Sequence, residues 1–260
     1  MSPIEPAERS RCGAELQVQR LGAPGATDTL LQQSWRDYIF AEIWQRPGLA
    51  TRARYWIAMA GAACEPGGGA LAENYIRGAL ASGEVTLPEV REAALHLAVY
   101  AGFSRGTALD EAATRAAQAL GIEEAPAVPI REVAWDPQVR LAEGAQSFED
   151  AMLFPAPPPA TPYFEAGILN FVFGEMWLRP GLDQRSRRWI TLVGVADSSS
   201  RTPIRTHVYA AIKSGNASME EIQEFVLQYA VHGGWPKASV LQGAVIDMAK
   251  LVAANKPYED

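Results

Sequence analysis

The stretch FVFGEMWLRPGLDQRSRRWITLVG, Phe171–Gly194, decides the fold because the chain contains it twice. The first copy, YIFAEIWQRPGLATRARYWIAMAG, occupies Tyr38–Gly61. The copies align without a gap at an offset of 133 residues, and twelve of the 22 positions from Phe40 to Gly61 are identical. A solenoid unit is shorter, roughly 20–50 residues. The sequence therefore predicts a duplicated domain, with a first repeat at residues 1–133 and a second at residues 134–260.

Composition excludes several classes of protein. The chain has 260 residues, 48% of them hydrophobic and 20% charged, which is ordinary for a globular protein. Its net charge of −7 argues against a nucleic-acid partner, which requires a basic face. Two distant cysteines, Cys12 and Cys64, are typical of a reducing compartment. No basic-then-apolar signal segment opens the chain, and its apolar runs are too short to cross a bilayer, so we expect a cytoplasmic protein without a membrane partner.

Helical periodicity runs through both copies, and no stretch alternates with the period of a strand. The pattern predicts an all-α fold of two similar helical bundles. We expect the segment Met1–Thr29 to be an irregular, packed arm and Phe154–Pro162 to be a stiff, extended connection. Helices are expected over Leu30–Gln45, Thr51–Ala63, Ala70–Ser82, Thr86–Ala101, Ser104–Gly121, Tyr163–Leu178, Asp183–Ala196, Thr202–Gly215, Ser218–Gly233 and Pro236–Asn255.

The repeated stretch also resembles a known family. Its G-E-x-W-x-R-P-G-L, followed by R-x-R and an apolar run, is similar to the carboxymuconolactone decarboxylase family. The resemblance continues through the segment Arg205–Gly215, which looks like that family's H-x-x-x-A-x-x-x-G, and on to Pro236. Together the two copies cover most of the chain. The fold that the resemblance implies is the small helical bundle of the alkylhydroperoxidase D-like type.

His207 is the strongest candidate for catalysis. It lies beside the apolar face of its helix, where a lone histidine is more often a core residue. The resemblance reverses that preference, because His207 occupies the place of the family's active-site histidine. In the first copy the matching position, at an offset of 132, is Tyr75. The two sites are therefore expected to differ, one intact and one altered.

Two further histidines have weaker claims. His232 matches Tyr100 of the first copy, and an aromatic-packed core position is as good an interpretation of it as a place in the pocket. His96 follows Glu92 by four residues, which favours a surface ion pair of small value.

Charged residues recur at matching positions in the two copies. Glu224 and Glu175 are candidate catalytic carboxylates, although a solvated helix face for Glu224 and a structural pair of Glu175 with Arg179 or Arg187 are the favoured alternatives. Arg187 and Arg54 suit a carboxylate-bearing ligand, with bridging between helices as the alternative. The substrate-binding residues that we expect are Arg187, Arg54, Trp177, His232, Tyr75 and Tyr100.

Other chemistries lack their motifs. The histidines have no metal-site spacing, and no nucleophile or dinucleotide motif occurs. The loop Glu65–Gly69 lacks the lysine of a phosphate-binding loop. The sister branch of the resembled family, the alkylhydroperoxidase D-type proteins, has C-x-x-C before the histidine, whereas this chain has the segment Ser200–Pro203 there. A thiol peroxidase is therefore disfavoured.

The resemblance implies a cofactor-independent carboxy-lyase in aromatic-compound catabolism, acting on a small carboxylated lactone or a related intermediate. Loss of CO2 would leave a dienolate that needs hydrogen-bond donors and an acid, for which His207 is suited, while arginines hold a dianionic substrate. An isomerase or hydrolase of another lactone remains an alternative. So does a non-catalytic binding or assembly module with degenerate sites, to which Tyr75 points.

The duplication also predicts an assembly. Two copies in one chain are most economically a fused dimer. If single-domain relatives form a ring of three dimers, three chains of this protein rebuild the ring as a homotrimer. Intact His207 sites and altered Tyr75 sites would then alternate around it.

Overall fold

The computed structural model describes residues 5–124, 126–130 and 132–258. Within these ranges the chain is helical and contains no strand, as the periodicity predicts. The first half consists of α1 (Pro6–Leu21), α2 (Leu30–Ser34), η1 (Trp35–Ile43), α3 (Thr51–Cys64), α4 (Gly69–Ala81), α5 (Leu87–Ala101) and α6 (Phe103–Leu120). The second half consists of α7 (Pro137–Met152), η2 (Tyr163–Met176), α8 (Gln184–Ser198), α9 (Arg201–Lys213), α10 (Met219–Gly233) and α11 (Trp235–Ala253).

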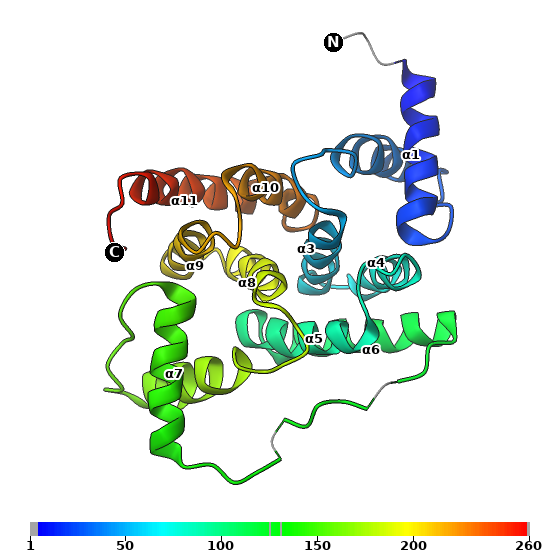
Figure 1. Cartoon of the computed structure of the whole chain (residues 1–260). Coiled ribbons are helices and arrows are strands. Elements are labelled where there is room, and N and C mark those ends of the chain that lie inside the picture. The colour runs from blue at the N-terminus through cyan, green and yellow to red at the C-terminus, as the bar shows by residue number, and fades with distance from the viewer. Residues whose placement is uncertain (1–4, 125, 131, 259–260) are drawn as a thin grey trace.

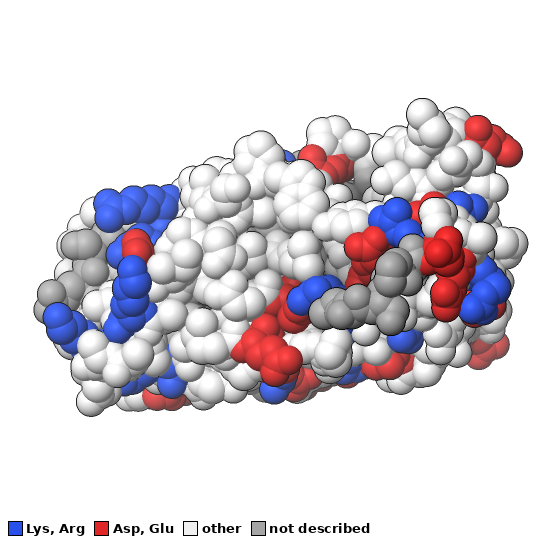
Figure 2. Space-filling model, turned by 90° about the horizontal axis from the view of Figure 1, so that it is seen from above, with Lys and Arg blue, Asp and Glu red and all other residues white. Residues whose placement is uncertain are grey.

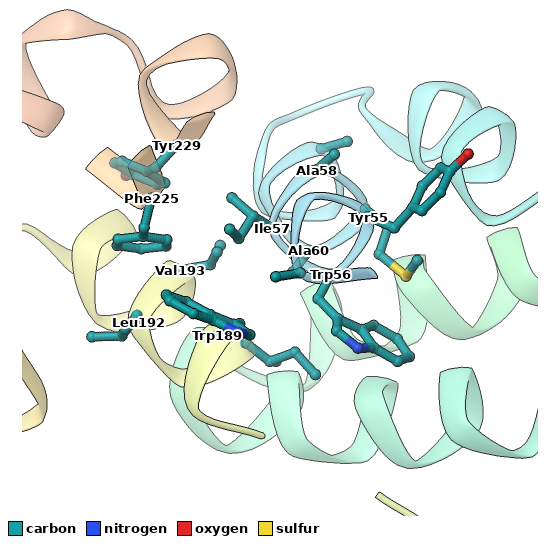
Figure 3. Close-up of a cluster of buried hydrophobic side chains, with 14 of the residues drawn as sticks. Tyr55, Trp56, Ile57, Ala58, Ala60, Trp189, Leu192, Val193, Phe225 and Tyr229 are labelled. Atoms are coloured by element: carbon teal, nitrogen blue, oxygen red, sulfur yellow. The ribbon is translucent and has the colours of Figure 1, made fainter. Parts of the chain in front are cut away.

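Helices α3 and α8 form the centre of the molecule, and the remaining helices surround them (Figure 1). Both are buried on all sides over most of their length, from Ala53 to Cys64 in α3 and from Ser186 to Ala196 in α8, although each also buries arginine side chains. Figure 3 shows Trp189 of α8, Phe225 of α10 and Ile57 of α3 turned toward one another, and the rings of Trp189 and Phe225 lie 5.8 Å apart. The two copies of the repeated stretch therefore pack into one shared core.

Glycines at matching positions bring the halves together. A Cβ atom on Gly194 of α8 would lie 2.6 Å from Cβ of Tyr100 on α5, and one on Gly61 of α3 would lie 3.1 Å from Cβ of His232 on α10. A side chain at position 194 would clash at this distance, and one at position 61 would make a tight contact that His232 would have to yield to. Each central helix thus receives an aromatic or imidazole ring from the opposite half.

The N-terminal segment is not irregular, as expected from its polar sequence, but forms helix α1. Its sequence conceals the helix because only Gly13, Gln17 and Leu21 are buried on it. Gly13 lies against the backbone of η1, where a Cβ atom would be 2.2 Å from the carbonyl oxygen of Arg36. Gly144 of α7 meets η2 in the same way, with 1.8 Å to the carbonyl oxygen of Leu169. The helix Leu30–Gln45 of the sequence analysis is also divided, into α2 and the π-helix η1.

Capping contacts fix the starts of three helices. Thr86 with Glu89 and Ser218 with Glu221 form capping boxes at α5 and α10. Asp183 caps α8 by accepting from the backbone of Ser186.

The predicted division between residues 133 and 134 falls in the segment between α6 and α7. The main core cluster contains residues from both sides of that point, including Trp56 and Trp189. Two repeats with their own boundaries therefore remain a prediction.

The surface seen in Figure 2 carries acidic and basic side chains close to one another at one end and a broad uncharged area beside them. Among the helices that the structure describes, none combines the length and the hydrophobicity needed to cross a membrane.

Candidate active site

His207 is buried on α9, 7% exposed, and three elements supply its neighbours. Arg188 comes from α8, Tyr100 from α5 of the other half, and Met152 from the end of α7. The rings of Tyr100 and His207 meet edge to face at 5.1 Å. The site is therefore built across the two halves, because Tyr100 belongs to the first half and His207 to the second.

Arg188 is 0% exposed, and no described ion pair includes it. Its guanidinium donates to the backbone carbonyl of Ala151 and lies 4.9 Å from the centre of the Trp177 ring. Burial lowers its pKa to about 10, so it stays charged at neutral pH. A buried cation without a carboxylate is costly in free energy unless a ligand supplies the anion.

The contact with Arg188 fixes the protonation of His207. Arg188 Nη1 lies 3.4 Å from His207 Nδ1, and a guanidinium can only donate. Nδ1 is therefore the acceptor, and Nε2 carries the hydrogen. Burial and then the charge of Arg188 hold the pKa of His207 well below its usual value, so the imidazole is neutral. The ring presents an N–H donor on the edge that Arg188 does not occupy.

Tyr100 is held in place by Trp177, whose Nε1 donates to the Tyr100 hydroxyl at 2.7 Å. Burial raises the pKa of Tyr100 to about 12, so the phenol stays protonated. His96 lies one turn earlier on α5, and its Nε2 is 2.8 Å from the Thr191 hydroxyl. The expectation of a surface ion pair for His96 was wrong, since its side chain is 1% exposed and faces the interior.

A cavity of about 510 Å³ opens beside His207 and Tyr100. The Pro-rich connection, η2 and the C-terminal residue Tyr258 complete its wall. Aromatic rings make up much of the lining: Tyr100, Phe148, Phe154, Tyr163, Phe164, Phe173 and Tyr258. Hydroxyl groups of Ser198, Ser200, Thr202 and Thr206 line another part. Small-molecule sites in proteins have this character, roughly 300–1,000 Å³ with an apolar wall and few polar groups.

The matching place in the first half is closed. Tyr75 is fully buried and stacks on Trp44 at 5.8 Å, with His232 edge-on at 5.4 Å. Trp44 Nε1, the Tyr75 hydroxyl and His232 Nε2 have no partner among the described residues. Neither Tyr75 nor His232 lines the nearby cavity, which Trp35 borders instead. The rings of Tyr75, which is fully buried, and His232, which is half-buried, thus pack against each other, and a substrate-binding role for either stays a prediction.

The remaining charged candidates lie away from His207. Glu224 accepts from Arg46 Nε at 2.8 Å and from Arg54 Nη2 at 3.1 Å. Burial would raise the pKa of Glu224, but these two arginines lower it below its usual value. In the other direction Glu92 pairs with Arg179, with 2.8 Å to Nε. Each half therefore supplies the arginine of W-x-R-P-G-L to a glutamate of the other half.

Glu175 and Arg187 are placed in turn and helix contacts. Glu175 pairs with Arg140 of α7 at 2.7 Å, rather than with Arg179 or Arg187. Arg187 donates to the backbone carbonyls of Met176, Arg179 and Leu182 and so fastens the turn before α8. None of Glu224, Glu175, Arg54 and Arg187 lines the cavity beside His207.

Sequence reasoning missed Arg188. The position differs between the copies, where Tyr55 matches it at an offset of 133, and the comparison of copies emphasised what they share. A signal was present, because Tyr55 and Tyr75 replace a cation and an imidazole together. The hydroxyl of Tyr55 donates to the carbonyl of Arg20 at 2.8 Å, much as Arg188 donates to that of Ala151.

Comparison with known proteins gives the class. The model of the carboxymuconolactone decarboxylase family matches residues 162–245, which include η2 to most of α11. A nitrosuccinic acid decarboxylase of Metarhizium robertsii is 35% identical over 105 residues, which cover 38% of this chain and 73% of that protein. The chain belongs to the carboxymuconolactone decarboxylase family.

A second relative is more distant. The 4-carboxymuconolactone decarboxylase of Acinetobacter baylyi is 28% identical over 76 residues, which cover 29% of this chain and 56% of that protein. The chain thus spans about half the length of that relative. Both relatives are decarboxylases by name, and they differ in substrate.

Proposed function

We propose that this protein is a cofactor-independent decarboxylase whose active site is the cavity beside His207. The observation that carries the proposal is Arg188, a buried cation without a carboxylate partner, placed directly behind the imidazole. An anionic ligand would supply the missing negative charge. Membership of a family with decarboxylases among its relatives supports the reaction class, and the substrate remains part of the proposal.

The Nε2–H group of His207 can donate a hydrogen bond to the oxygen atom that receives the negative charge during the reaction. In a decarboxylation the negative charge leaves the carboxylate and settles on an acceptor oxygen, such as a carbonyl conjugated to the reacting carbon. Catalysis requires stronger stabilisation of that final position than of the starting one. We place the acceptor oxygen at Nε2–H of His207, where the charge of Arg188 strengthens the hydrogen bond in a desolvated setting.

The leaving carboxylate then lies beside the acceptor oxygen at the His207 end of the cavity, and the rest of the ligand lies along the wall that includes Ser198 and Thr206. The C–C bond breaks, CO2 departs, and the electron pair enters the conjugated system. A neutral imidazole is a poor source of a full proton, so a water molecule entering the cavity gives one proton to the carbon, and the hydroxide that remains combines with the released CO2 to give bicarbonate. This differs from the acid role expected for His207, because its lowered pKa leaves no proton to give beyond the one on Nε2.

We assign structural roles to the other charged candidates. Glu224 with Arg54, and Glu175 with Arg140, join helices through ion pairs, and Arg187 closes the turn before α8. Trp177 and Tyr100 act as positioning residues, since one bonds the other and both contact groups of the site.

The test is release of CO2 by the purified chain from carboxymuconolactone and from simple β-keto acids. We expect turnover by the wild type, and a fall of about 100- to 1,000-fold in kcat/KM for His207→Gln. Tyr209→Phe, two residues along α9 and bonded to the Lys256 carbonyl, serves as the control for damage to the helix. Binding of these acids without CO2 release would favour the binding module.

We also propose that the two halves arose by duplication and that three chains form a closed homotrimer. The shared core of α3 and α8 supports a fused dimer. Sedimentation equilibrium tests the assembly, and a mass of one, two or six chains would show the trimer to be wrong.

A further inference from the structure

The described part of the wall of the cavity beside His207 carries no charged side chain. Among the described residues that line it there is no lysine, arginine, aspartate or glutamate. Apart from hydroxyl groups and the imidazole of His207, the lining is aromatic, aliphatic or proline. Whatever part of a ligand lies away from His207 therefore lies against apolar or weakly polar surface.

Among the described contacts of the lining side chains, the positive charge that touches this cavity's wall is that of Arg188. Arg188 contacts Nδ1 of His207 from behind, and His207 forms part of the wall. The other buried arginines of this region are engaged elsewhere: Arg187 with backbone carbonyls and Arg179 with Glu92. The site can thus stabilise one anionic group, at the His207 end.

We propose that the ligand is a monocarboxylic acid with an apolar or aromatic body, rather than a dicarboxylic acid. This inference rests on the proposed function for the place at which the ligand reacts. The preference for one carboxylate over two is argued separately, from the absence of charged side chains in the described wall. It departs from the dianionic substrate that the family resemblance implies. The carboxylate and the acceptor oxygen of a β-keto acid are close neighbours, so both remain within the field of Arg188 throughout the reaction.

The energetic reason is desolvation. A second carboxylate would leave water to lie beside rings such as Phe164 and Phe173, with no cation in the described wall to replace its hydration. A methyl or phenyl group in the same place gains free energy from burial. Replacing a terminal methyl by a carboxylate should therefore weaken binding even when length and shape are kept.

Binding of unreactive acids tests this directly. Hexanoate and hexanedioate differ in one terminal group, and 3-phenylpropanoate adds an aromatic ring. Isothermal titration of the full chain should give a Kd for hexanoate about tenfold or more below that for hexanedioate, with 3-phenylpropanoate tighter than both. Equal or tighter binding of hexanedioate, or no binding of any of the three at millimolar concentration, would overturn the inference.

A change in the wall provides a second test. Ile168 of η2 lines the cavity, and Ile168→Lys adds a cation there, while Ile168→Met adds similar length without charge. The ratio of the hexanedioate Kd to the hexanoate Kd should be about tenfold lower for the lysine variant than for the methionine variant. The same ratio in both variants would show that charge in the wall does not set the preference.

Reactive acids separate this inference from the proposed function. Benzoylacetate is an aromatic β-keto monoacid and 3-oxoadipate is a β-keto diacid, and both report through CO2. If the monoacids bind as expected and neither keto acid is decarboxylated, the proposed function fails and the inference stands. If hexanedioate binds more tightly and 3-oxoadipate is turned over faster than benzoylacetate, the inference fails and the proposed function stands.

Discussion

The His207 site and its counterpart at Tyr75 share a scaffold but not a charge. In both, a central helix lies beneath the ring, the opposite half contributes a second ring, and a tryptophan follows the π-helix. Arg188 and His207 of one site are Tyr55 and Tyr75 in the other. The first site opens on a cavity, whereas the second is filled by Trp44, Tyr75 and His232.

The hydrogen bonds show how little else differs. Tyr55 donates to the backbone carbonyl of Arg20 in α1, and Arg188 donates to that of Ala151 in α7. Each of these helices is the first of its half. A tyrosine makes that bond without bringing a charge into the core. The difference teaches that Arg188 is not needed to join these helices, so its burial points to a ligand.

The largest effect is expected from removing the charge. Arg188→Met should lower kcat/KM by about 1,000-fold, because the donor edge of His207 loses the field that strengthens it. The free energy of unfolding should rise or stay unchanged, because an unpaired buried cation disappears. Steady-state kinetics and urea unfolding measure the two quantities.

The control is Tyr55→Phe, which removes the corresponding bond in the other half. It should cost about 1 kcal/mol of stability and leave activity intact. If Arg188→Met destabilises the chain and keeps its activity, the arginine is a structural residue after all.

The next effect concerns the ion pairs that cross between the halves. Glu92→Gln should lower the free energy of unfolding by about 3–5 kcal/mol, since Arg179 is 5% exposed and loses its only paired carboxylate among the described residues. Arg46→Met should cost only about 1 kcal/mol, because Arg46 is 50% exposed and Glu224 keeps Arg54. Equal losses in the two variants would contradict this difference in burial.

Acid should destabilise the chain through its histidines. Burial lowers the pKa of His232 to about 4 and holds those of His96 and His207 well below their usual value. The unfolded chain therefore binds more protons between about pH 6.5 and pH 4, and stability present above that window is lost as pH falls through it. His232 contributes on the order of 3 kcal/mol to this loss.

His232→Phe tests that contribution. The free energy of unfolding of the variant should depend less steeply on pH between about 6.5 and 4. The difference in slope should correspond to about one proton fewer taken up on unfolding. Urea unfolding at several pH values measures the slope, and an unchanged slope would mean that His232 is already protonated in the folded chain or solvated within it.

The smallest effect belongs to the Tyr75 hydroxyl, which is buried without a partner among the described residues. Tyr75→Phe should raise the free energy of unfolding by about 1 kcal/mol, because the cost of an unpaired hydroxyl disappears. Thermal unfolding at fixed pH measures it. A loss of stability would indicate that a bound water or ligand occupies this place.

The sequence was sufficient for most helices, but not for α1 and α7, and it did not show which helices pack together. Turn residues and capping boxes such as Thr86 with Glu89 fix where helices begin, because those contacts are local. The sequence did not predict helix α1, because Gly13 packs directly on the backbone of η1 and the helix therefore needs no apolar stripe.

The site was predictable only in part for a similar reason. His207 carried a family motif and lines a cavity, while its catalytic role stays a prediction. Arg188 had no motif, and its meaning depends on the absence of a carboxylate among described neighbours, which only packing decides. Glu224 and Arg54 were noticed because they recur, yet recurrence reflects a contact between halves as readily as a contact with substrate.

The close contact of Tyr100 with Gly194 joins the two halves, and it has a consequence for how they are paired. The places around His207 and around Tyr75 each include a ring from the opposite half. If the two halves were separate chains, each would have to pair with the other kind, and half of all random pairings would join two halves of the same kind. A single covalent chain removes that sorting problem. One half can then lack the cation and the imidazole while still forming the wall that the other half requires.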